Sequence, residues 1–94
     1  MARLQFARPF LEDLSLLDEA VELEVWRKLE LVERVPGVGS SLVEPMLRTA
    51  FGDSCLKIAA AGYDVLYERT QGGKEGAAEE IVRVLGIIAQ RRVR

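Results

Sequence analysis

The stretch from Cys55 to Arg94 constrains the fold more than any other part of the chain. It reads CLKIAAAGYDVLYERT, a polar Gly-rich segment, and EEIVRVLGIIAQRRVR. Two strand-like runs meet at Ala61-Gly62, where Gly62 can adopt the positive φ that a short antiparallel connection requires. The third run, residues 81–88, is apolar on both strand faces apart from Arg83, which is typical of a central strand. The pattern predicts an antiparallel sheet that ends in a cluster of arginines.

The N-terminal half predicts a strand followed by two helices. Residues 4–7 suit a short strand, and Pro9 suits the first turn of a helix, where its missing N–H has no intrahelical partner. Asp18 is a predicted N-cap for a second helix that ends at Pro36. Apolar residues recur at helical spacing in both segments: Phe10, Leu11, Leu14 and Leu17 in the first, and Val21, Val25, Trp26, Leu29 and Val32 in the second.

The segments that join these elements are polar or rich in glycine. Residues 35–54 are expected to be a loop with one short helix at 41–47, and residues 71–76 are expected to be a flexible loop. The resulting order is strand, helix, helix and three strands. We therefore expect one α+β domain over residues 1–94, with both helices packed on one face of a mainly antiparallel sheet.

Composition narrows the class of protein. A chain of 94 residues with 49% apolar residues supports one core. No apolar run approaches the roughly 20 residues that cross a bilayer, and one cysteine forms no internal disulfide, so we expect a cytoplasmic protein without a membrane partner. The net charge of −2 is unlike that of a protein held mainly by phosphate contacts, although the terminal arginines allow a local basic patch.

Several chemistries are excluded by residue type. The chain has no histidine, and Cys55 alone makes no zinc site, so we expect neither a metal nor a cofactor. Cys55 is expected to be a buried small hydrophobe, and Trp26 to belong to the core. The PGVGSS segment at 36–41 lacks the lysine of a P-loop and follows a helix, which indicates a helix end and turn. The carboxylates of residues 12–24 fit a solvated helical surface.

A set of basic and aromatic residues remains as the candidate site. Each one alone is adequately explained as a surface charge or a half-buried strand residue. If the strands pair in order, the set gathers on one sheet face, where Arg and Lys would hold phosphate or an acidic peptide. The set comprises Arg48, Lys57, Tyr63, Tyr67, Arg83, Arg91, Arg92 and Arg94.

Three segments together resemble one protein family. The hairpin GYDVLYER is similar to the "GYRLVYE" strand of the RelE/ParE superfamily of bacterial toxins, and IVRVLGIIAQRRV resembles its last strand with a basic end. The two-helix segment that ends in VPGVGSSLVEPMLR matches the family's pattern, in which "L..L...P" precedes a "..P.L" loop before the hairpin. The resemblance covers nearly the whole chain. It implies an N-terminal strand and a helical hairpin on a mainly antiparallel sheet.

The resemblance also implies a function. Members of the family are toxins of type II toxin–antitoxin pairs, held inactive by an antitoxin that wraps the toxin as an ordered peptide. RelE-like members cleave mRNA in the ribosomal A site, and ParE-like members inhibit DNA gyrase. Carried over by position, the resemblance implies catalytic roles for Lys57, Arg83, Arg91 and Arg92, and target-binding roles for Arg48, Tyr63, Tyr67 and Arg94.

Departures from the family pattern limit what can be carried over. RelE-like nucleases place two lysines in the first hairpin strand, where this chain has Lys57 and Ala59. Asp64 stands where the family has an arginine that faces phosphate. Near the C-terminus, Ile88 and Arg94 are the approximate counterparts of the family's catalytic arginine and tyrosine, although a small shift would put Arg91 or Arg92 in the arginine's place. Electrostatic groups of this type contribute about 3 kcal/mol each to catalysis. We therefore do not expect efficient cleavage.

Three hypotheses follow. The first is a toxin-like protein that binds gyrase or the ribosome and is neutralised by a cognate antitoxin. The second is a ribosome-dependent mRNA endoribonuclease, so the resemblance leaves open whether the chain is an enzyme. The third is a non-toxic interaction module whose sheet binds a peptide or a second copy as a homodimer.

Overall fold

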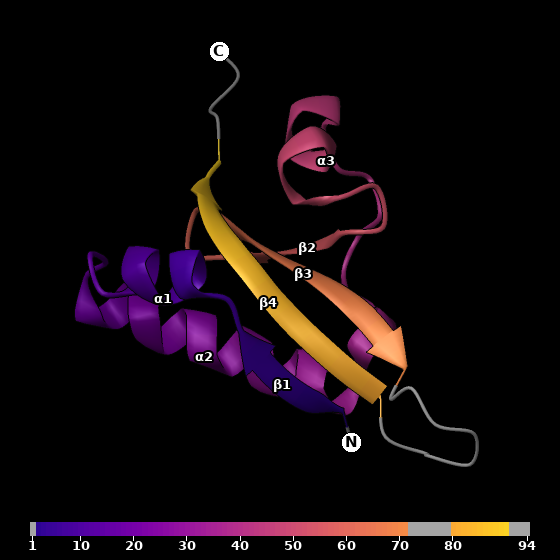
Figure 1. The fold of residues 1–94 in the computed structure, drawn as a ribbon. Coiled ribbons are helices and arrows are strands. Elements are labelled where there is room, and N and C mark those ends of the chain that lie inside the picture. The colour runs from indigo at the N-terminus through magenta and orange to yellow at the C-terminus, as the bar shows by residue number, and fades with distance from the viewer. Residues whose placement is uncertain (1, 72–79, 91–94) are drawn as a thin grey trace.

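The computed structural model describes residues 2–71 and 80–90, which form four strands, three α-helices and one 3-10 turn (Figure 1). In chain order these are β1 (Arg3–Phe6), α1 (Arg8–Leu14), α2 (Glu19–Arg34), η1 (Pro36–Val38), α3 (Pro45–Phe51), β2 (Leu56–Ala60), β3 (Tyr63–Gln71) and β4 (Glu80–Ala89). The α+β class and the order of the predicted strands and helices are confirmed. None of these helices is long and apolar enough to cross a membrane.

The strands form one sheet in the order β1-β4-β3-β2. β4 pairs parallel with β1 and antiparallel with β3, and β2 pairs antiparallel with β3. The prediction of β4 as a central strand is confirmed, since β1 and β3 pair with its two edges. Most of the expected polar loop at 71–76 lies outside the described residues, and β3 itself extends to Gln71.

The β2–β3 hairpin turns through two residues with positive φ, Ala61 at 50° and Gly62 at 85°. The positive φ of Gly62 confirms the prediction for this connection, and the positive φ of Ala61 adds to it; two consecutive left-handed residues match the right-handed twist of the flanking strands. A β-bulge follows, because Leu66 pairs with Gly86 while Tyr67 pairs with Val84, which leaves Leu85 as the extra residue.

The helices follow the predicted order with shifted ends. α1 ends at Leu14, so Leu17 packs against the core from the connection rather than from the helix. α2 begins after Asp18, although the Asp18 side chain makes no capping hydrogen bond. The third helix was predicted at 41–47 but spans Pro45–Phe51, because Pro45 occupies its first turn and Gly52, with φ of 104°, ends it.

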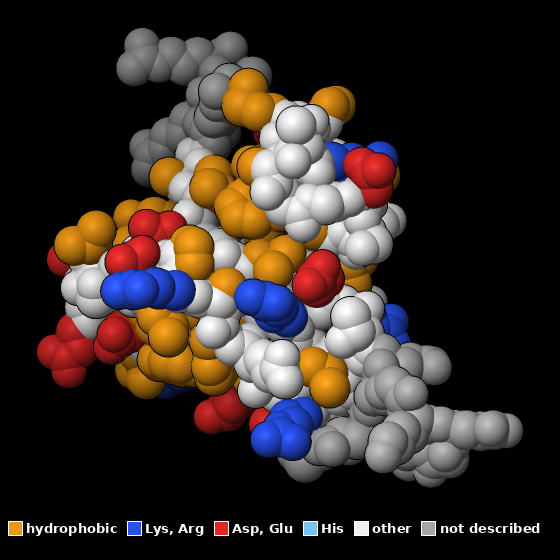
Figure 2. Space-filling model, viewed as in Figure 1, with side chains coloured by type: hydrophobic (Ala, Val, Ile, Leu, Met, Phe, Trp, Pro, Cys, Tyr) orange, Lys and Arg blue, Asp and Glu red, His pale blue; other side chains and the backbone are white. Residues whose placement is uncertain are grey.

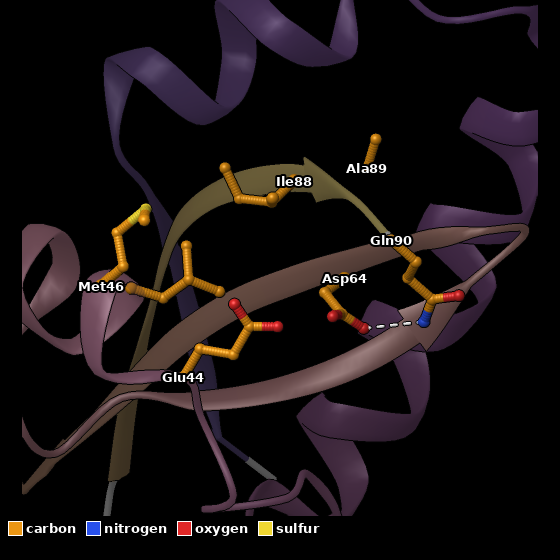
Figure 3. A pocket seen from close by; sticks show the side chains of 7 residues that line it. Glu44, Met46, Asp64, Ile88, Ala89 and Gln90 are labelled. Carbon is orange, nitrogen blue, oxygen red and sulfur yellow. Dashed lines mark hydrogen bonds between the residues drawn. The ribbon is translucent and has the colours of Figure 1, made fainter. Parts of the chain in front are cut away.

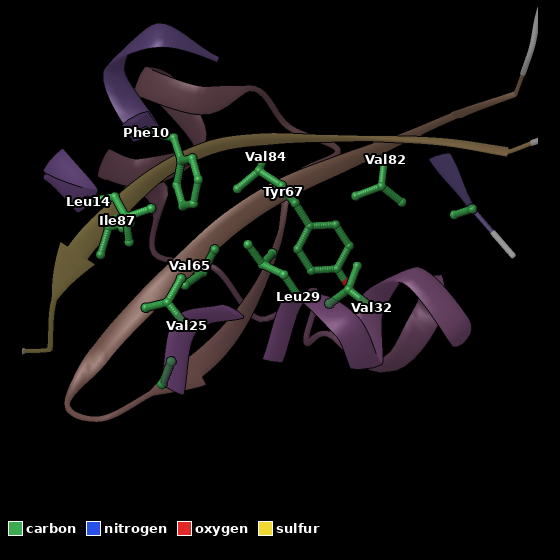
Figure 4. Packing of buried hydrophobic residues seen from close by; sticks show 12 residues of the cluster. Phe10, Leu14, Val25, Leu29, Val32, Val65, Tyr67, Val82, Val84 and Ile87 are labelled. Atoms are coloured by element: carbon green, nitrogen blue, oxygen red, sulfur yellow. The ribbon is translucent and has the colours of Figure 1, made fainter. Parts of the chain in front are cut away.

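The main core lies between the sheet and the pair α1 and α2 (Figure 4). α1 contacts β4, and α2 contacts β2. Trp26 is partly buried against this core and meets the rings of Phe6 and Phe10 edge-on, with centroids 5.5 Å and 6.3 Å away. The buried cluster consists of Ala2, Phe10, Leu14, Val25, Leu29, Val32, Ala60, Val65, Tyr67, Val82, Val84 and Ile87.

The opposite face of the sheet is covered over a smaller area by α3 and the segment before it. Leu66, Val43 and Cys55 are buried there. The ring of Phe51 lies so close to Gly86 that an added Cβ would approach it to 2.8 Å. The glycine therefore lets α3 dock onto β4. We call this face, with its residues Lys57, Ala59, Asp64, Leu66, Glu68, Arg83 and Gly86, the α3 face.

Candidate functional site

The strand register divides the predicted site residues between the two faces of the sheet. Lys57 pairs with Leu66, and Arg83 pairs with Glu68 two residues further along β3. Side chains two apart on a strand share a face, so Lys57 and Arg83 both lie on the α3 face. Tyr63 and Tyr67 alternate with them and lie on the face that α1 and α2 cover. The expectation that the whole set shares one face is therefore wrong for the two tyrosines.

Tyr67 is a structural residue. Its side chain is fully buried, and its hydroxyl donates to the Pro36 carbonyl at 2.8 Å and accepts from the Gly39 N–H at 2.8 Å. A Cβ at Gly39 would overlap the hydroxyl, so the glycine makes room for this bond. Burial raises the pKa of the Tyr67 phenol. The predicted target contact of Tyr67 is not supported, because no part of the ring reaches the surface.

Tyr63 lies on the opposite sheet face from the two strand cations, and Arg48 belongs to α3 rather than to a strand. Tyr63 is partly buried against the main core. Arg48 is exposed on α3, where its guanidinium donates to the Ser41 carbonyl at 3.0 Å and holds the segment before the helix. Of the residues expected to bind a target, Arg48 alone is both described and exposed. Arg91, Arg92 and Arg94 lie outside the described residues.

The α3 face carries both signs of charge. Glu68 lies directly opposite Arg83, and Asp64 lies directly opposite Ala59. Ala59 and Asp64, the two departures from the family pattern, are therefore neighbours on adjacent strands. Only the strand register shows this. In the space-filling view, the acidic and basic side chains of the described residues are interspersed over the visible surface and form no continuous basic area there (Figure 2). This arrangement fits phosphate poorly, because Glu68 lies opposite Arg83 and Asp64 adds a second carboxylate to the face that carries Lys57.

Cys55 lies under this face as a buried thiol with 2% exposure, which confirms the prediction of a small hydrophobe. Burial raises its pKa, while the nearby Arg48 charge lowers it by less. A thiol that holds its proton this strongly is a poor nucleophile. The described residues also contain no group of three or more Cys, Asp or Glu side chains that could hold a metal ion.

A small pocket opens between α3 and the adjoining ends of β3 and β4 (Figure 3). Its volume of about 90 Å³ is far below the range of roughly 300–1,000 Å³ typical of small-molecule sites. Asp64 enters it from β3, and its Oδ1 accepts a hydrogen bond from Gln90 Nε2 at 2.9 Å. The lining residues are Glu44, Met46, Leu47, Asp64, Ile88, Ala89 and Gln90.

Sequence reasoning did not find this pocket. Glu44 and Gln90 lie within segments that resemble the family, but no site role was expected for either. Gln90 reaches Asp64 because β4 pairs antiparallel with β3, and Glu44 joins them from the residue before α3. The Gln90 N–H donates to the Gly62 carbonyl at 2.9 Å, which fixes the end of β4 beside the turn.

Comparison with solved structures identifies the fold. The chain matches no protein-family model and no curated protein. It superposes on the isolated E. coli RelE toxin with a TM-score of 0.72 and 19% identity, over 100% of this chain and 89% of that one. It matches a chain of the intact E. coli RelBE toxin–antitoxin complex with a TM-score of 0.66 and 20% identity, over 98% of this chain and 100% of that one.

A third structure, a mutant of E. coli RelE in the free state, gives a TM-score of 0.63 and 22% identity, over 95% of this chain and 84% of that one. These matches span the sheet and the helices together, so they do not depend on one shared motif. The order of elements that the hairpin and the last strand predicted is thereby confirmed, and the protein has the fold of the RelE toxins.

Proposed function

We propose that this protein is the toxin component of a type II toxin–antitoxin pair, which binds a macromolecular target and is neutralised by an antitoxin. The observation that carries the proposal is the match to RelE over the full length of this chain. The match to a chain of the RelBE toxin–antitoxin complex supports an antitoxin as the regulating partner.

The charge arrangement favours target binding over phosphate chemistry. Stabilising a crowded phosphate requires several cations that act together in a site prepared for negative charge. On the α3 face, Lys57 and Arg83 share their surroundings with Asp64 and Glu68. Among the strand residues of this face the two carboxylates balance the two cations, which favours a binding role for this surface.

Regulated expression of the chain in a bacterial host tests the proposal. Growth should stop on induction and resume when the small reading frame adjacent to the gene is co-expressed. Unchanged growth, together with the absence of any binder encoded beside the gene, would contradict the toxin assignment and favour the non-toxic interaction module.

Pulse labelling shortly after induction identifies the target. An early loss of amino-acid incorporation indicates the ribosome, and an early loss of thymidine incorporation indicates gyrase. The double variant Lys57→Gln/Arg83→Gln tests the α3 face in the same assay. The matched control is Arg8→Gln/Arg27→Gln, which removes two exposed helical cations and the same total charge. We expect the first variant to be less toxic and the control to be as toxic as the wild type.

A further inference from the structure

The pocket beside α3 combines an anionic wall with apolar walls. Glu44, the residue before α3, and Asp64, near the start of β3, both direct their carboxylates into the space between these elements (Figure 3). Leu47 and Ile88 provide apolar lining. The pocket therefore has the two surfaces that a long cationic side chain needs, a negative end for its head group and apolar contact for its methylenes.

No cation of the described residues neutralises this anionic wall. Glu44 and Arg48 are four residues apart, a spacing that permits an ion pair, but the Arg48 guanidinium donates to the Ser41 carbonyl instead. Asp64 receives one neutral amide hydrogen from Gln90 at its Oδ1. The described ion pairs all lie elsewhere, and the second oxygen of Asp64 has no hydrogen bond from a described side chain.

One large apolar side chain is exposed at the pocket, and another is exposed nearby in the sequence. Met46 lines the pocket and is 67% exposed, and Leu42, two residues before Glu44, is 79% exposed. Exposed apolar groups at the rim of a polar pocket are typical of protein-binding surfaces. A nucleic acid is disfavoured here, because two carboxylates repel phosphate at short range.

We propose that this pocket is a docking point for a partner protein segment that presents one lysine or arginine between apolar side chains. The basic side chain enters between Glu44 and Asp64, and its apolar neighbours cover Met46 and Leu42. The volume admits the end of one side chain and no more. The proposal goes beyond the proposed function and does not depend on toxicity, since it concerns only what this pocket binds.

Titration of the ¹⁵N-labelled full chain with short peptides tests the proposal directly. The probes are Ac-Leu-Arg-Leu-NH₂, its neutral citrulline isostere, and Ac-Gly-Arg-Gly-NH₂. We expect saturable amide shifts at Leu47, Asp64 and Gln90 with the first peptide, weaker binding of the glycine peptide, and no saturation with the citrulline peptide. Added salt should weaken binding of the first peptide.

The test variant is Glu44→Gln/Asp64→Asn, which removes both charges and keeps an oxygen at position 64 to accept the Gln90 bond. It should bind Ac-Leu-Arg-Leu-NH₂ about fivefold more weakly, the upper range for a partly exposed ion pair. The matched control is Asp13→Asn/Glu30→Gln, which removes two exposed helical carboxylates and should bind like the wild type.

Three outcomes would overturn the proposal. Equal binding of the arginine and citrulline peptides would remove the charge argument. If the arginine peptide bound the triple variant Arg91→Ala/Arg92→Ala/Arg94→Ala but not the wild type, the occupant of the pocket would be the chain's own terminus. Shifts at the same amides that grow with protein concentration, without any peptide, would identify a second copy. None of these readouts uses growth. A failure of this proposal can therefore be told apart from a failure of the toxin assignment.

Discussion

The two faces of the sheet differ in what covers them. α1 and α2 close one face over a cluster of twelve buried residues that includes Phe10, Leu29 and Val84. On the other face the seven-residue α3 is anchored by Phe51 over Gly86 and leaves Lys57, Asp64, Glu68 and Arg83 at the surface. Apolar burial is thus concentrated on the first face, which we expect to dominate stability. The second face retains polar groups available to a partner.

The first prediction tests whether stability is concentrated on the closed face. Leu29→Ala should lower the free energy of unfolding by about 2–5 kcal/mol, because it removes methylenes and leaves a cavity in a fully buried site. Leu23→Ala, on the exposed side of the same helix, should change it by less than about 0.5 kcal/mol. Urea unfolding followed by circular dichroism measures both. Equal effects would contradict the assignment of stability to the core that α2 covers.

Tyr67→Phe tests the polar contact within the closed face. It should cost about 1–3 kcal/mol, because the Pro36 carbonyl and the Gly39 N–H lose their shared partner. The control is Tyr63→Phe, at a tyrosine for which the structure describes no hydroxyl hydrogen bond, and it should cost less. Urea unfolding at neutral pH provides the comparison.

The stability that Tyr67 provides should also depend on pH. Because burial raises the pKa of Tyr67 above its ordinary value of 10.0, the folded state holds the phenolic proton more strongly than the unfolded state. This contribution is complete below pH 10 and is lost as the pH rises through the raised pKa. Burial of Cys55 acts in the same direction from its ordinary pKa of 9.0. Urea midpoints measured across the alkaline range should therefore fall more steeply for the wild type than for Tyr67→Phe.

Gly86→Ala tests the attachment of α3 to the open face. The added methyl would lie 2.8 Å from the Phe51 ring, and overpacking of this kind costs about 1–3 kcal/mol when the ring cannot move. We expect a cost at the lower end of that range, since α3 is short and exposed on its outer side. The double variant with Phe51→Leu should recover part of the loss. A loss as large as that of Leu29→Ala would mean that the two faces are equally rigid.

The smallest effect on stability is expected from Ala59→Lys/Asp64→Arg. These residues lie opposite each other on β2 and β3, so the two changes create one cationic area on the α3 face. Retention on a heparin column should rise and should fall again with salt, while the urea midpoint stays within about 0.5 kcal/mol of the wild type. The control Glu12→Arg/Ala20→Lys makes the same change of three charges at two exposed helical positions. Equal retention of both variants would show that positive charge on the α3 face attracts heparin no more strongly than the same charge on the helices.

The local sequence determined the elements of this fold. Ala61-Gly62 between alternating residues specified the hairpin, and the apolar run at 81–88 specified a central strand. The spacing of Val25, Leu29 and Val32 specified α2. These features depend on side-chain periodicity and backbone preference within a few residues, which the sequence records directly. α3 starts later than the predicted 41–47, because Pro45 occupies its first turn.

The composition of the site was decided by tertiary structure. Which face a side chain takes depends on strand register, and register depends on pairing between segments far apart in the chain. The register places Tyr67 and Lys57 on opposite faces of the sheet. It also places Glu68 opposite Arg83 and Ala59 opposite Asp64. The pocket of Glu44 and Asp64 likewise exists only because Phe51 fits over Gly86, which holds α3 near the end of β4. The sequence thus determined which elements form, and packing between distant segments decided which side chains share a surface.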